Sequence, residues 1–308
     1  MDVLIGYFGI SNILSLNYIA SSLNLLFFYL TWATLVMSQT PLRIELLGSC
    51  AMRVIFYWIP TLLFTAFDGL MPGLSSDLKL RRGPRPTGTE QLGIAINALI
   101  NQLISAFIQG LVLFVRSHIL MRKTPIFNIG TTLPLPWNMI IDILFILASR
   151  EAIIYVVHRY VLHNPSRYKT LSGFHSIHHK YAKSPTFALK AHYAHPLDHF
   201  VLQFLPLYIP AYFRRVHLLT FFLTLAIVSL ESAVIYSGYD IFWGFFGGTV
   251  RRIDRHHRPG GQYKDFGIWG FIDWVAGTSG SGSRPKKDGW GIDVKKRYQM
   301  RGTSGDAR

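Results

Sequence analysis

The chain has 308 residues, of which 50% are hydrophobic and only 15% are charged. Ordinary soluble domains carry about 25% charged residues, so the composition argues against a disordered chain and against a soluble nucleic-acid-binding protein, despite a formal net charge of +15. The basic residues lie between long apolar stretches, which is typical of charges that flank membrane spans. The single cysteine, Cys50, excludes an internal disulfide and suits a reducing, cytosol-facing environment.

Apolar stretches long enough to cross a bilayer begin near the N-terminus, which lacks the basic region of a secretory signal. Residues 13–37 carry no charge and exceed the ~20 residues that a membrane helix requires. The second stretch, 46–71, is interrupted only by Arg53 and Asp68, and the third, 92–115, is uncharged. We therefore expect three membrane spans in the N-terminal part of the chain.

Two further apolar regions follow. Residues 137–157 contain Asp142, Arg150 and Glu151, and charges at such depth usually mark a functional site or a buried pair. The Arg150–Glu151 dipeptide is equally compatible with an interfacial pair near the end of the helix. Residues 196–239 have prolines and arginines near their middle, so we predict two shorter spans that form a hairpin in the membrane.

The predicted fold is therefore an all-α, multi-pass integral membrane protein with about four transmembrane helices and a cytosolic histidine-rich cap. Residues 1–136 form an N-terminal membrane region with a basic connector, 137–280 a catalytic domain, and 281–308 a basic tail. The connector (Lys79 to Arg85) and the tail hold much of the basic excess, and the positive-inside rule places both in the cytosol. There they would orient the protein and offer a docking surface for an acidic electron donor.

Eight of the twelve histidines fall between His158 and His199, which is far more than an even distribution would give. His158 and His163 open this region. Residues five apart lie about 140° apart around a helix, but Pro165 discourages further helix, so that the last turn can unwind and bring His163 toward His158.

The next histidines have the spacing of metal ligands. His175, His178 and His179 are three and four residues apart, which on a helix places their rings on one face. The spacing of three residues recurs in the next group, which consists of His192, His195 and the acid Asp198. A last pair, His256 and His257, follows a second acid, Asp254. Asp198 and Asp254 are either direct ligands or acceptors that orient the rings.

Imidazole binds zinc, copper, iron and nickel, so the ligand type alone does not select the metal. Eight to ten clustered histidines suffice for two metals, whereas a hydrolytic zinc site uses three ligands. Two redox irons beside an apolar pocket would suit oxygen activation against an unactivated C–H bond.

The order of these motifs resembles the fatty acid hydroxylase/sterol desaturase superfamily, from about Asp142 to Gly280. The middle motif, in which His192 and His195 precede Pro196 and Asp198, is most similar to the sterol C5-desaturase branch. The resemblance implies a membrane-bound non-haem di-iron oxygenase, usually of the endoplasmic reticulum. It also implies O₂ as oxidant, with electrons from NAD(P)H delivered through cytochrome b5 or its reductase.

The resemblance further implies a set of metal ligands in this chain, which are His158, His163, His175, His178, His179, His192, His195, His256 and His257. Two positions depart from the family pattern. Ile253 stands where the last motif normally has its first histidine, and Tyr236 replaces a histidine before Ser237-Gly238-Tyr239. Isoleucine cannot bind a metal. Either Asp254 replaces the missing ligand, or one iron is under-coordinated.

The predicted function is hydroxylation or desaturation of an unactivated C–H position in a lipid-like substrate, such as a sterol, a fatty acyl chain or an apolar secondary metabolite. The predicted partners are the bilayer, that substrate and the electron donor, with no nucleic acid. Two alternatives stay open, namely a non-catalytic relative with a degenerate metal site and a membrane metal-binding or transport protein.

Overall fold

The computed structural model describes residues 22–83, 85–121, 125–181, 184–239, 247–258 and 260–280. All regular elements in these residues are helices, and the β-pairing is limited to isolated bridges. The all-α prediction is therefore confirmed. The predicted tail, 281–308, and residues 13–21 of the first apolar stretch lie outside the described residues; the remainder of that stretch belongs to the helix Ser22–Ser38.

Within the described residues, three helices are long and apolar enough to cross a membrane. Two of them correspond to the predicted spans 46–71 and 92–115, whereas the sequence predicts the third as a shorter arm of the hairpin. The first, Pro41–Leu70, comprises α2 (Pro41–Arg53), a π-helical turn η1 (Val54–Trp58) and α3 (Ile59–Leu70), and the short α4 (Pro72–Leu78) follows it. The second comprises α5 (Gly88–Phe114) and η2 (Val115–Ile119), and the third is α10 (Leu218–Ser237). The chain is thus a multi-pass helical membrane protein.

The fourth predicted stretch forms helix α6 (Pro136–Val157), whose charged residues all have partners within the fold. Asp142 pairs with Arg214 at 2.6 Å. Arg150 forms a buried ion pair with Glu231 of α10 at 2.7 Å, whereas Glu151 accepts backbone N–H groups from residues 268–270. Arg150 and Glu151 are thus both buried but do not form the interfacial pair that the sequence left open.

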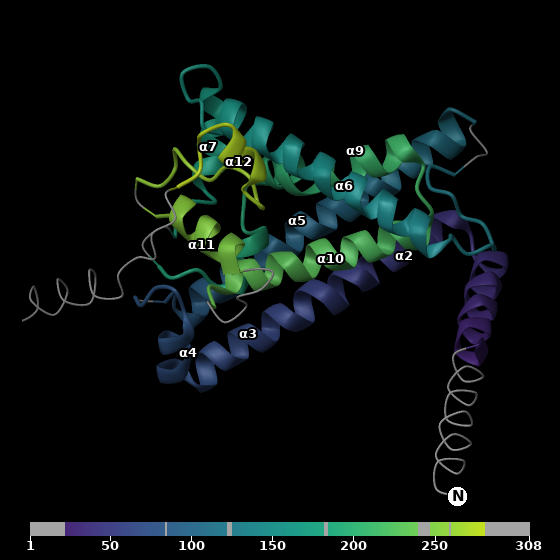
Figure 1. The fold of residues 1–308 in the computed structure, drawn as a ribbon, viewed down its shortest axis with the longest axis horizontal. Coiled ribbons are helices and arrows are strands. Elements are labelled where there is room, and N and C mark those ends of the chain that lie inside the picture. Colours follow the sequence, from purple (N-terminus) through teal and green to yellow (C-terminus); the bar gives the residue numbers. More distant parts are fainter. Residues whose placement is uncertain are drawn as a thin grey trace, which may run out of the picture.

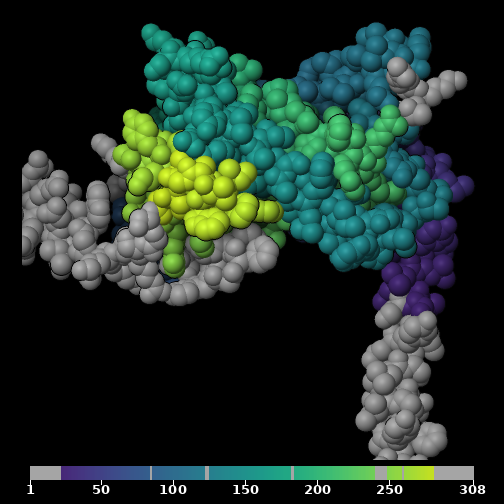
Figure 2. Space-filling view, turned by 45° about the horizontal axis from the view of Figure 1, so that its top comes forward, coloured from purple at the N-terminus to yellow at the C-terminus, as the bar shows by residue number. Residues whose placement is uncertain are grey.

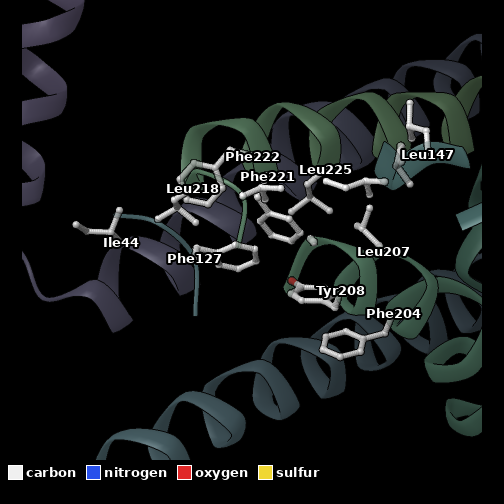
Figure 3. Packing of buried hydrophobic residues seen from close by; sticks show 14 of the residues in the cluster. Ile44, Phe127, Leu147, Phe204, Leu207, Tyr208, Leu218, Phe221, Phe222 and Leu225 are labelled. Atoms are coloured by element: carbon white, nitrogen blue, oxygen red, sulfur yellow. The ribbon is translucent and has the colours of Figure 1, made fainter. Parts of the chain in front are cut away.

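The predicted hairpin is present, but its two arms are unequal. The first arm comprises α8 (Pro196–His199), η5 (Phe200–Phe204) and α9 (Leu205–Arg214), and the chain reverses at Arg215 in the left-handed conformation. The second arm is α10, which is long enough to cross the membrane by itself. The arms pack through an aromatic core in which the Phe221 ring lies 4.4 Å from that of Phe127 and 5.0 Å from that of Tyr208 (Figure 3).

The remaining helices gather at one end of the long ones and form a cap (Figure 1). They are η3 (His158–Leu162), α7 (Lys169–Ser176), η4 (Ala188–His192), α11 (Gly247–His256) and α12 (Phe271–Val275). In the space-filling view the C-terminal part of the cap lies directly on the middle of the chain (Figure 2). Residues far apart in the sequence therefore meet in the cap, as a shared site requires.

The basic connector does not form a free charged surface. Lys79 pairs with Asp68 at 2.5 Å, Arg81 pairs with Asp254 of α11 at 2.6 Å, and Arg85 donates to the hydroxyl of Ser75 at 2.7 Å. These contacts join the connector to α3, α4 and the cap. The connector therefore stabilises the fold. Because these three side chains are paired within the protein, they contribute less to a docking surface for an electron donor than the sequence predicts.

Candidate metal centre

Five imidazoles from three segments of the cap converge on one point. They belong to His158, His163, His175, His179 and His256, and their ligand nitrogens all lie within 4.8 Å of one another. Neighbouring Nε2 atoms are only 3.1–3.2 Å apart. Two nitrogens bound to one metal at right angles, each at ~2.1 Å, would be separated by about 3 Å. The spacing therefore fits a single metal ion at the centre of the five nitrogens.

His158 and His163 meet as the sequence predicts, but by a different local geometry. Residues 158–162 form the π-helical turn η3, and the backbone N–H of His163 donates to the carbonyl of His158 at 3.0 Å. A π-turn is closed by such i to i+5 hydrogen bonds. It therefore brings residues five apart close together, so that the two Nε2 atoms lie 3.2 Å apart without unwinding of the helix before Pro165.

The outer nitrogens of three rings are held by acceptors. His158 Nδ1 donates to the carbonyl of Phe266 and His256 Nδ1 to that of Lys264, each at 2.7 Å. His175 Nδ1 donates to both carboxylate oxygens of Asp198 at 3.0 and 3.1 Å. Because the proton resides on Nδ1, each Nε2 lone pair faces the centre of the cluster. This arrangement orients metal-ligating histidines and raises their basicity.

Burial favours the neutral form of four of the five rings. It lowers the pKa of His158, His163, His179 and His256. The neighbouring imidazoles lower these pKa values further, because a positive charge on one ring would repel a positive charge on the next. Neutral imidazole is the form that binds metals. The cluster is therefore ready to accept a metal at neutral pH.

A loop held by two acids supports the cluster from outside. Glu151 accepts the N–H groups of Ile268 and Gly270 at 2.9 and 3.1 Å, and Asp273 accepts those of Phe266 and Gly267 at 2.9 and 2.7 Å. These bonds fix the Phe266 carbonyl that receives the His158 proton. The role of Glu151 depends on a contact across more than one hundred residues, so no local sequence pattern indicates it.

His178 and His257 form a second group beside the first. The rings of His178 and His257 lie 4.9 Å apart, and the His257 ring lies 4.9 Å from that of His179. His178 Nδ1 donates to the Tyr193 carbonyl at 2.6 Å and His257 Nδ1 to the Ile253 carbonyl at 2.8 Å, so both Nε2 atoms carry lone pairs.

The two departures from the family pattern lie at this second group. The Tyr236 hydroxyl lies 3.0 Å from His178 Nε2. His257 Nε2 is buried and has no hydrogen-bond partner within the described residues. The Ile253 side chain is buried among apolar neighbours that include Tyr236. The second group therefore offers two imidazole nitrogens and one phenol oxygen.

His192 and His195 lie outside both groups. His192 Nδ1 lies 2.8 Å from Nε2 of His199, away from the five-ring cluster. His195 caps helix α8 by accepting the N–H of Leu197, and its ring stacks on Phe174 at 3.8 Å. Their spacing matches that of His175 and His178, but His195 precedes Pro196 in extended backbone, where helical periodicity does not apply.

The two candidate acids differ in position. Asp198 touches the cluster through His175, as described above. Asp254 is fully buried, and its oxygens are bound by arginines: Oδ1 by Arg81 at 2.6 Å and Oδ2 by Arg258 at 2.5 Å. Asp254 therefore has the contacts of a structural ion-pair centre, and Asp198 those of an acid that orients a ring.

A cavity of about 50 Å³ adjoins the histidines. Its polar wall includes His175, His178 and His257, and its apolar wall includes Ile154 and Leu202. An apolar group that enters this cavity would lie beside both histidine groups.

The fold and the site together define a helical membrane protein with a buried polyhistidine centre. The sequence profile of the fatty acid hydroxylase family matches residues 143–278. This range contains both histidine groups, the supporting loop and the two candidate acids. Residues 143–278 are therefore similar to the fatty acid hydroxylase family, as the order of the histidine motifs indicates.

Similar proteins include sterol and fatty acid oxygenases. The chain is 29% identical to methylsterol monooxygenase 1-2 of Arabidopsis thaliana over 161 residues, which cover 49% of the chain and 51% of that relative. It is 28% identical to methylsterol monooxygenase 1-1 of the same plant over 48% of the chain and 50% of the relative. It is also 32% identical to fatty acid hydroxylase ahd1 of Mycosarcoma maydis, over 36% of the chain and 27% of the relative.

The chain thus spans about half the length of the methylsterol monooxygenases that it matches. No solved structure matches the chain.

Proposed function

We propose that the protein is a membrane-bound, iron-dependent oxygenase that hydroxylates an unactivated C–H position of a lipid. The observation that carries this proposal is the convergence of five imidazole nitrogens next to a cavity, in the part of the chain that matches the fatty acid hydroxylase family. The similar proteins are named as monooxygenases and a hydroxylase, which favours oxygen insertion over desaturation.

The residues present fit a metal centre. His158, His163, His175, His179 and His256 would hold one iron, because their lone pairs face a common point. His178 and His257 would hold a second iron, with the phenol oxygen of Tyr236 as a third donor in place of an imidazole. Iron held in these positions supplies the redox chemistry that activates O₂ for insertion of one oxygen atom into a C–H bond.

The chain's own residues prepare this reaction. Asp198 and the carbonyls of Phe266 and Lys264 keep the Nδ1 protons away from the centre, so that the Nε2 atoms stay available. Burial of the rings excludes water, and the adjoining cavity places an apolar chain beside them. One oxygen atom enters the substrate as a hydroxyl group and the other leaves as water, so a reductant must supply an electron pair.

Cytochrome b5 or its reductase, drawing on NAD(P)H, is the electron donor that we propose. We place the protein in the endoplasmic reticulum with the cap facing the cytosol, where such a donor would reach it. Desaturation, as in the sterol C5-desaturase branch, needs the same reductant and removes a second hydrogen instead of adding oxygen.

A specific observation keeps a second candidate in place. Ile253 and Tyr236 leave the second group with two histidines, which is compatible with a non-catalytic relative that retains one metal. A metal transporter is less well supported, because the histidine groups lie together in the cap and not along the described spans.

The proposed function is tested by isotope labelling. The purified, iron-loaded protein is given host lipid extract, NADPH, cytochrome b5 with its reductase, and ¹⁸O₂, and the lipids are analysed by mass spectrometry. Hydroxylation predicts a product that contains one ¹⁸O atom, and desaturation predicts an unlabelled product that lacks two hydrogens.

His178→Ala should abolish either product, whereas His118→Ala, at an exposed position outside the cap, should not. Failure of the iron-loaded protein to oxidise any lipid would favour the non-catalytic alternative.

A further inference from the structure

A second cavity lies between the membrane helices, and its wall is unusually polar for such a place. It has a volume of about 30 Å³. The aliphatic and aromatic part of its wall includes Phe204, Leu207 and Leu225, which also pack in the core shown in Figure 3. The polar part includes Arg53, Gln102, His192 and Ser229. A polar pocket inside a membrane-embedded bundle usually marks a functional site.

Two donors in this wall have no acceptor among the described residues. Arg53 donates through Nη2 to the Tyr208 hydroxyl at 3.3 Å, but its Nη1 atom is buried and has no partner in that part of the chain. Gln102 accepts a hydrogen bond from Trp58 Nε1 at 2.8 Å, and its own Nε2 atom is likewise buried without a described partner.

Arg53 also lacks a counter-ion, because no carboxylate of the described residues lies within 4.0 Å of its guanidinium nitrogens. Arg53 is partly buried, and a charge in such a position is more stable when it is paired. A ligand that accepts hydrogen bonds and carries negative charge would satisfy both donors and pair with the guanidinium.

The pocket shares part of its wall with the cavity beside the histidine groups. His199 and Gln203 line both this cavity and the one beside the histidine groups. A ligand with its polar end near Arg53 and its apolar chain directed toward these two side chains would point at the histidine cavity.

We propose that Arg53 and Gln102 bind the carboxylate of a long-chain acyl substrate and hold its apolar chain toward the histidine centre. This inference rests on the proposed function for the identity of the bound molecule as substrate. A carboxylate has only acceptor oxygens and one negative charge, and it matches one guanidinium and one amide donor. A hydroxyl group would match one donor but would leave the charge of Arg53 unpaired.

Binding tests the proposal without any turnover. The metal-free protein in nanodiscs is titrated with radiolabelled hexadecanoate, and unlabelled hexadecanoate, its methyl ester and hexadecan-1-ol compete for the site. The charge-assisted hydrogen bonds predict that the acid competes at least about tenfold more strongly than the ester or the alcohol. Arg53→Met should remove this preference, and Gln102→Met should reduce it.

Arg43→Met is the matched control, because Arg43 lies in the same helix α2 but is exposed. Equal competition by acid and alcohol in the wild-type protein, or an unchanged acid preference in Arg53→Met, would overturn the proposal. Oxidation of lipids without acid preference would refute the carboxylate site and leave the proposed function in place. A preference for the acid in a protein that oxidises no lipid would support the carboxylate site and refute the proposed function.

Discussion

Replacement of Asp198 by asparagine tests how the metal centre is oriented. The buried carboxylate accepts the Nδ1 proton of His175 at 3.0 and 3.1 Å, and His175 Nε2 lies 3.1 Å from those of His158 and His179. Asparagine has nearly the same shape but no charge. The change therefore lowers the basicity of the His175 ring without emptying the site.

The expected loss is ten- to one-hundredfold in metal affinity, the usual effect of removing such an acceptor. Because each factor of ten corresponds to ~1.4 kcal/mol, the binding free energy should weaken by about 1.4–2.8 kcal/mol. The assay is competition for iron(II) between the purified protein and a chelator of known affinity.

Asp142→Asn is the matched control, because Asp142 pairs with Arg214 outside the cap and should not affect metal binding. Iron affinity in Asp198→Asn equal to that of the wild type would refute the role given to this acid. An equal loss in both variants would point to a general effect on folding.

Three more substitutions test the surroundings of the centre. Asp254→Asn should lower the free energy of unfolding by about 2 kcal/mol in denaturant titrations, because its buried ion pairs are lost, and unchanged stability would contradict this role. Gly267→Ala should weaken metal binding, because a Cβ at this position would lie 2.5 Å from Glu151 Oε1. Gly173→Ala is the control, since a Cβ there would meet nothing within 4 Å. Similar metal contents of the two variants would refute the supporting role of the loop. Tyr236→Phe should lower the iron content from two ions to one per chain, and retention of both would show that the phenol oxygen is not a ligand.

Much of the fold follows from local sequence. The apolar stretches of the membrane helices are continuous and long, so burial in lipid dictates helix whatever the neighbours are. The hairpin was harder to predict, because the prolines near its middle belong to the first arm only. Its second arm, α10, is uninterrupted, and its single acid, Glu231, is neutralised by Arg150 of another helix.

The metal centre shows where sequence spacing succeeds. His175 and His179 meet because they are four residues apart at the end of a helix and in the turn that follows it. His178, three residues after His175, instead faces Tyr193 and Tyr236, because helix α7 ends at Ser176. Of the three rings predicted to share one helix face, the structure brings His175 and His179 into the five-ring cluster and places His178 in the second group.

Long-range contacts explain the rest. Asp254 precedes His256 and His257 in the sequence, which suggests that it binds a metal or orients a ring. In the structure its carboxylate is bound by Arg81 of the connector. Glu151 and the second cavity depend on residues that only the folded chain brings together, so no spacing pattern indicates them. What sequence supplies is the set of imidazoles, and what the fold supplies is the acceptors that orient them.

The central claim is that the histidines of the cap hold iron, and the metal content of the purified protein tests it most directly. Elemental analysis of the detergent-purified wild-type protein should give two iron ions per chain, and His175→Ala should lose the metal of the five-histidine cluster while still inserting into the membrane. Absence of iron from the wild type, or an unchanged iron content in His175→Ala, would contradict the account.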